Sequence, residues 1–207
     1  MTTRATATTS SATCSRTGVE VLDGTTLVLD GVGFAGVKGF GGGFQGYAVE
    51  AFGERALKRF VEAIHDEVQK LDAALRALQT PTKVALLHYA PIHDTLVGEP
   101  ECIWPFLGCS RFATRLDTRR ATVAFHGHAH RGAPAGTTDS GVPVFNVAMP
   151  VLQRGGRQLH IWSISSWNRD STHRRSGHLE PGGHHDGILG ELLLQRRKVE
   201  GTRNRVL

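Results

Sequence analysis

Three histidines follow one apolar run of the chain within five residues. The run Val123–Phe125 leads into His126, Gly127, His128, Ala129 and His130. Imidazole nitrogens bind first-row divalent metals well, and open α/β sheets bind their ligands beyond the carboxyl ends of strands. The pattern therefore predicts a metal site at the end of a strand, with a histidine-rich surface turn as the alternative.

A fourth histidine also lies at the end of an apolar run, in another part of the sequence. His88 ends the apolar run that starts at Lys83, and Pro91 marks the loop behind it. Alone, such a histidine would more often be structural. Together with residues 126–130 it indicates two strand ends that present imidazoles to one crevice. His93 and Asp94, in the loop after His88, are candidates for facing a substrate, although solvent exposure is the simpler explanation for both.

Apolar and β-rich runs predict the strands that would hold these histidines. A hairpin is predicted around Asp23-Gly24, with strands at 19–22 and 26–29. Near-continuous apolar runs predict buried strands at 83–88, 122–125 and 142–147, and a further strand at 160–164. A loop of about thirty residues, of the length that usually carries function or is disordered, follows His88.

A long amphipathic helix is predicted from about Ala48 to Gln79. Apolar residues recur there at steps of four and three, which places them on one face: Leu57, Val61, Ile64, Val68, Leu71, Leu75 and Leu78. Thr80-Pro81 ends the helix. The pattern indicates a helix that covers a sheet, and a coiled coil is the alternative.

A glycine cluster between Gly31 and Gly46 predicts a strand that runs into an irregular loop, because glycine disfavours helix. Gly31, Gly33 and Gly36 also match the dinucleotide-binding fingerprint. That mechanism needs a helix that starts at the third glycine to hold a pyrophosphate. The glycines after Val37 argue against such a helix, so nucleotide binding is the weaker interpretation.

Composition limits the remaining classes of function. The chain has 207 residues, 40% of them hydrophobic, a net charge of +5 and 11 histidines. This modest charge, without interleaved aromatic residues, gives no reason to expect specific nucleic-acid binding. No run approaches the ~20 apolar residues of a membrane span. Three cysteines without a pairing or metal motif favour a cytoplasmic location.

The composition changes at both ends of the chain. Residues 1–18, rich in Thr, Ser and Ala, predict a disordered tail, and a transit peptide is the alternative. Residues 153–207 predict a basic tail, rich in His and Gly and largely disordered. The predicted domain is therefore 19–152.

The ordered set of these segments resembles the calcineurin-like metallophosphoesterase family. The resemblance rests on LLHYAP at 86–91, on HGHAH at 126–130, on the strand GVPVFNVA at 141–148 and on the glycine cluster. It implies part of an α/β/β/α sandwich with a mixed sheet. In that family, His88 and His128 would bind the second metal and His130 the first. His126 is not a ligand in that family and is expected either to pack or to donate a hydrogen bond behind the ligands, and Asn146 is a candidate for a similar supporting place. Two cations, commonly Mn, Fe or Zn, would activate water for attack on a phosphoester.

Three family motifs are not found in this sequence: Asp-x-His, Gly-Asp and Gly-Asn-His. The chain is therefore expected to correspond to the carboxyl-terminal half of the family's domain, and it lacks the carboxylate that bridges the metals. Imidazoles alone bind hard dications poorly. We expect weak metal affinity and little or no hydrolysis of a phosphoester whose identity the sequence does not indicate. The alternative is a non-catalytic fragment that binds a metal or a partner.

Overall fold

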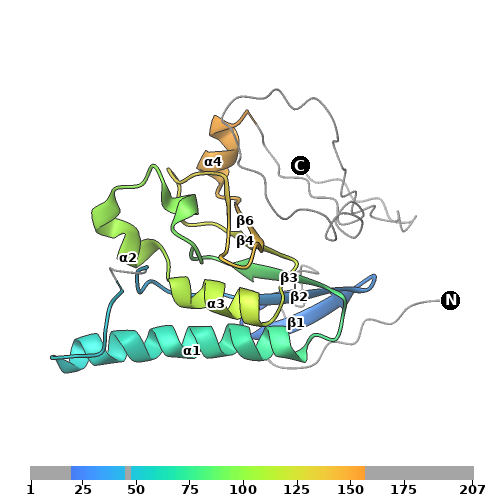
Figure 1. Ribbon diagram of the computed structural model, residues 1–207, viewed down its shortest axis with the longest axis horizontal. Coiled ribbons are helices and arrows are strands. Elements are labelled where there is room, and N and C mark those ends of the chain that lie inside the picture. The colour runs from blue at the N-terminus through green and yellow to red at the C-terminus, as the bar shows by residue number, and fades with distance from the viewer. Residues whose placement is uncertain (1–19, 45–47, 157–207) are drawn as a thin grey trace, which may run out of the picture. The chain divides into compact units, whose positions relative to one another are not determined.

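The computed structural model describes residues 20–44 and 48–156 (Figure 1). The predicted tail at 1–18, the predicted strand at 160–164 and the predicted basic tail beyond residue 156 lie outside the described residues. Helix α4 (Met149–Arg154) runs across the domain boundary predicted between residues 152 and 153. No helix among the described residues combines the length and the apolar character that a membrane crossing needs.

One mixed sheet organises the described residues. Its order is β1-β2-β3-β4-β6-β5, and the strands are β1 (Thr25–Leu29), β2 (Val32–Val37), β3 (Thr82–Leu87), β4 (Val123–His126), β5 (Ala135–Thr137) and β6 (Pro143–Asn146). The four inner strands are parallel, whereas β1 and β5 at the edges are antiparallel to their neighbours. The predicted α/β class with a mixed sheet is confirmed. The expected second sheet of the sandwich is not found in the described part of the chain.

Helices α1 (Arg55–Ala77) and α3 (Ser110–Thr118) pack side by side against one face of the sheet (Figure 1). Burial of Val61, Ile64, Val68, Leu71 and Leu75 confirms the predicted apolar face of α1. This face shares one core with side chains of β2, β3 and β4, so α1 covers a sheet and forms no coiled coil with another described helix. On the opposite face of the sheet, Leu86 of β3 is 38% exposed, so this strand is less completely covered than its sequence indicates.

The first hairpin turns at a different place from the one predicted. Strands β1 and β2 pair across Asp30-Gly31, whose φ angles are 48° and 81°. Such a pair of left-handed residues is what a two-residue hairpin turn requires. Asp23, in the turn predicted from sequence, instead binds the ammonium of Lys70 on α1 at 3.0 Å. Residues 20–22, the described part of the predicted first strand, form no strand.

Helix α1 begins seven residues later than its predicted start near Ala48. Val49 donates its backbone N–H to the Gly42 carbonyl, which ties this stretch back to the glycine loop. Gly53 then has a φ of +71°, outside the helical range. The helix can start only after that point. No helix follows Gly36 within residues 37–44, so the geometry required for the dinucleotide fingerprint is absent from these residues.

The segment predicted as a long loop after His88 contains regular structure. It includes the 3-10 helices η1 (Asp94–Leu96) and η2 (Glu101–Ile103), the short helix α2 (Trp104–Leu107) and α3. Phe112 and Leu116, four residues apart on α3, are fully buried. Their spacing is the helical signal that the prolines obscured.

Candidate functional site

The parallel strands end at one edge of the sheet, and backbone hydrogen bonds continue across it. His88 donates its N–H to the Lys38 carbonyl just beyond β2, at 3.0 Å. Gly127 donates to the His88 carbonyl at 3.2 Å, and Val147 donates to that of His126 at 2.8 Å. We call this region the carboxyl edge. It brings the ends of β2, β3, β4 and β6 together, and the sequence predicts this meeting for the ends of β3 and β4.

Two of the predicted metal ligands face each other at the carboxyl edge. The ring centroids of His88 and His128 are 4.7 Å apart, with an angle of 47° between the ring planes. Tyr89 contacts both rings, at centroid distances of 5.3 Å from His88 and 4.5 Å from His128. The structure therefore forms a compact cluster of three rings from the ends of β3 and β4.

The backbone at His128 is left-handed, with φ at 65°. This conformation is unusual for a residue with a side chain and is concentrated at functional sites. Asn146 stabilises the loop that follows: its Nδ2 donates to the Ala129 carbonyl at 2.7 Å, and its Oδ1 accepts from the Ala148 N–H at 3.1 Å. Asn146 thus supports the turn between His128 and His130 through the backbone.

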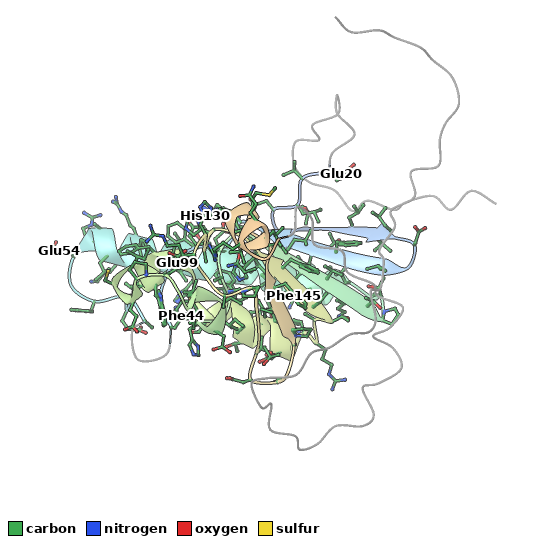
Figure 2. All side chains as sticks on the ribbon, turned by 90° about the horizontal axis from the view of Figure 1, so that it is seen from above. Glu20, Phe44, Glu54, Glu99, His130 and Phe145 are labelled. Atoms are coloured by element: carbon green, nitrogen blue, oxygen red, sulfur yellow. The ribbon has the colours of Figure 1, made fainter. Side chains whose placement is uncertain are left out.

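His130 lies beside α4 and near Glu99 (Figure 2). Arg154 on α4 donates to the His130 carbonyl at 2.6 Å and to that of Gly132 at 2.9 Å. Glu99 accepts the N–H of Arg131 at 2.7 Å. These bonds fix the backbone of the loop, while the His130 side chain is exposed. His130 does not join the ring cluster of His88, Tyr89 and His128 among the described contacts.

His126 is buried beneath the cluster and is 1% exposed. Its Nδ1 lies 2.8 Å from the Gly127 carbonyl, and its Nε2 lies 2.8 Å from the hydroxyl of Thr95. A carbonyl can only accept, so Nδ1 carries the proton. The single proton of the Thr95 hydroxyl has two acceptors in reach, Nε2 of the neutral ring at 2.8 Å and the Ile92 carbonyl at 3.2 Å, and the shorter contact assigns it to Nε2. His126 therefore links η1 to the end of β4. Its hydrogen bond to the Gly127 carbonyl also fixes the backbone directly before His128.

Burial acts on two of these imidazoles. It lowers the pKa of His126 from 6.5 to about 4. The pKa of His88 is also lowered, first by burial and then by the charges of His128 and His130. Both rings are therefore kept neutral near pH 7, and a neutral imidazole is the form that binds a metal.

The two candidate substrate-facing residues lie in a different part of the structure from the ring cluster. Nε2 of His93 lies 3.0 Å from Oδ1 of Asp94, and about half or more of each side chain is exposed. Both line a cavity of about 980 Å³ between the loop after β3, α2, α3 and the end of β5. His88, His128 and His130 do not line this cavity. The structure thus separates His93 and Asp94 from the ring cluster.

The donor set suits some metals better than others. The ring centroids of His88 and His128 are 4.7 Å apart, which is a normal separation for two packed rings. No group of three His, Cys, Asp or Glu in the described part of the chain is arranged to hold a metal. Two imidazoles would supply only part of the donor set of a borderline dication such as Zn²⁺. They do not fit a carboxylate-bridged pair of hard cations.

Sequence reasoning missed two partners of these histidines. Tyr89 directly follows His88 and completes the ring cluster. Thr95 is fully buried and binds His126 across 31 positions of sequence. The position of Tyr89 directly after His88 could have indicated its place in the cluster. Nothing local distinguishes Thr95 from other threonines of the chain.

The fold and the site together define an α/β protein with an imidazole cluster at the carboxyl edge of its parallel strands. Comparisons of the chain with protein-family models, with curated proteins and with solved structures found no match.

Proposed function

We propose that the chain carries the histidine part of a metal-dependent phosphoester hydrolase site. The observation that supports it best is the contact between His88 and His128 at the carboxyl edge, where open α/β sheets bind ligands. Sequence order adds support, because LLHYAP and HGHAH occur in the arrangement of the calcineurin-like metallophosphoesterases.

In this proposal His88 and His128 hold one divalent cation, and His130 is a further ligand that must turn toward them. Zn²⁺ fits the imidazole donors best, and Mn²⁺ and Fe²⁺ are the other candidates. A bound cation would supply charge to polarise a phosphoester and to lower the pKa of water. Tyr89 packs on both imidazoles and limits their rotation. Lys38 is exposed just beyond β2, where its carbonyl accepts the His88 N–H. Its ammonium, 5.0 Å from the centroid of the Phe40 ring, adds positive charge that would attract a phosphate to this end of the sheet.

Slow turnover is part of the proposal. Neutral imidazoles do not balance the charge of two cations, and the described residues offer no carboxylate in a three-ligand group with them. A site of this kind would bind metal weakly and hydrolyse phosphoesters slowly. We place this activity in the cytoplasm, since Cys102 and Cys109 are free thiols.

Hydrolysis of p-nitrophenyl phosphate and of its bis ester, with Mn²⁺ or Zn²⁺ added, tests the proposal. The informative variant is His128→Asn, because asparagine tolerates the left-handed backbone at this position. His93→Asn, at an exposed histidine outside the ring cluster, is the matched control. The proposal predicts slow, metal-dependent turnover that His128→Asn abolishes and His93→Asn retains. Turnover that is equal in both variants would refute it.

A second function, metal binding without catalysis, is favoured by one observation: the described residues lack a three-ligand group. Binding of Zn²⁺ that needs His88 and His128, in a protein with no phosphomonoesterase or phosphodiesterase activity, would select this function.

A further inference from the structure

The charged side chains that line the cavity between α2, α3 and the end of β5 are acidic, whereas the chain as a whole is positively charged. Four carboxylates line the cavity: Asp94, Glu101, Asp117 and Asp139. No Lys or Arg does, although the chain has a net charge of +5. An anionic phosphoester would be repelled from such a lining, whereas a cation would be attracted.

The same cavity has an aromatic wall. The ring of His93 contacts those of Phe44 and Trp104, with centroid distances of 6.4 Å to each. Pro91, Ile92 and Ala113 extend the apolar part of the lining. Aromatic faces attract organic cations and also bury apolar groups. The lining therefore combines a surface for an aromatic or apolar body with carboxylates for a positive charge.

Two of the carboxylates are available to a ligand. Glu101 and Asp139 form no ion pair with any described residue and are exposed. The other two already have partners, since Asp94 lies 3.0 Å from the His93 ring and Asp117 accepts the Thr138 hydroxyl. The volume, about 980 Å³, lies at the upper end of the range of small-molecule sites.

We propose that this cavity binds an organic ammonium ion attached to an aromatic or apolar body. The apolar body packs against Phe44 and Trp104, and the ammonium is placed near Glu101 and Asp139. This site is separate from the imidazole cluster, since none of His88, His128 and His130 lines the cavity. The inference does not depend on the hydrolase proposal.

Three probes with one indole ring and different charges test the inference. Tryptamine is a cation, tryptophol is neutral and indole-3-propionate is an anion. Their dissociation constants for the full chain can be measured by ligand-observed NMR at low salt, where electrostatic attraction is least screened. We expect tryptamine to bind about tenfold more tightly than tryptophol, because its ammonium meets the carboxylates of Glu101 and Asp139, an attraction that the neutral alcohol lacks, and indole-3-propionate to bind weakest.

Variants locate the binding. Glu101→Gln with Asp139→Asn should reduce tryptamine affinity to that of tryptophol, and Trp104→Leu should weaken both probes several-fold. Glu62→Gln with Asp66→Asn, on the exposed side of α1, is the charge-matched control and should change neither. His88→Asn should also leave tryptamine binding unchanged, which separates this site from the metal site. Equal affinities of the three probes, strongest binding of indole-3-propionate, or no binding of tryptamine at millimolar concentration would each overturn the inference.

Discussion

Acidification should weaken the folded state through one buried imidazole, His126. Its pKa is about 4 in the folded protein, because the ring is buried, against 6.5 for an exposed histidine. Between these two values the unfolded chain binds a proton that the folded protein excludes. The free energy of unfolding therefore falls as the pH falls through this window. At about 1.4 kcal/mol per pH unit, the loss between pH 7 and pH 4 amounts to about 3 kcal/mol.

The pH range between 4 and 7 separates the effect of His126 from that of the buried carboxylate of Asp72. The pKa of Asp72 lies below 3.8, because Arg119 binds it through two hydrogen bonds of 2.8 Å. Its contribution to stability is lost only at lower pH, as the carboxylate becomes protonated. His88, whose pKa is also lowered, contributes in the same direction as His126. The test is therefore the difference between the wild-type chain and a variant that lacks the His126 imidazole.

His126→Phe provides that variant, because phenylalanine is similar in size and does not titrate. Urea unfolding followed by circular dichroism at pH 4, 5, 6 and 7 gives the free energy of unfolding at each pH. We expect the variant to show a dependence on pH between 4 and 7 that is smaller by about 3 kcal/mol. An equally steep dependence in His126→Phe would refute the reasoning.

Further changes test the supports of the carboxyl edge and of the core. Thr95→Val should lower the free energy of unfolding at pH 7 by about 1–3 kcal/mol, measured by urea unfolding, because Nε2 of His126 loses its partner; an unchanged value would contradict the hydrogen bond between Thr95 and His126. Gly132→Ala should cost about 1–3 kcal/mol, because a Cβ there would collide with the Thr95 carbonyl; a melting temperature equal to that of the wild type would contradict the close approach. Phe112→Ala should cost about 3–5 kcal/mol in the same unfolding assay, because the ring is fully buried beneath the sheet; a loss below 1 kcal/mol would show that α3 does not pack there.

The sequence predicts the sheet well because its inner strands have simple patterns. The runs 83–88 and 122–125 are apolar and short, and each leads into a histidine, so β3, β4 and the meeting of His88 with His128 follow from them. The apolar stripe from Val61 to Leu75 likewise predicts which face of α1 is buried. In these segments local pattern and tertiary packing agree.

Other features depend on contacts that no local pattern contains. The first hairpin has two Asp-Gly pairs to choose from, and the pairing of β1 with β2 selects Asp30-Gly31 while Lys70 binds Asp23. The start of α1 depends on the hydrogen bond from Val49 to Gly42. The partner of His126 and the carboxylate-lined cavity come from segments that are distant in sequence and meet only in the folded chain.

Zinc binding by individual histidines tests the central claim most directly. Five of the 11 histidines lie outside the described residues, so total zinc uptake does not identify the site. Long-range ¹H–¹⁵N NMR spectra, assigned with His88→Asn and His128→Asn, report on each imidazole separately. Titration with Zn²⁺ to saturation should shift the ring nitrogens of His88 and His128 together and leave those of His126 unchanged. Unshifted signals from His88 and His128, while other histidines take up the zinc, would contradict the account.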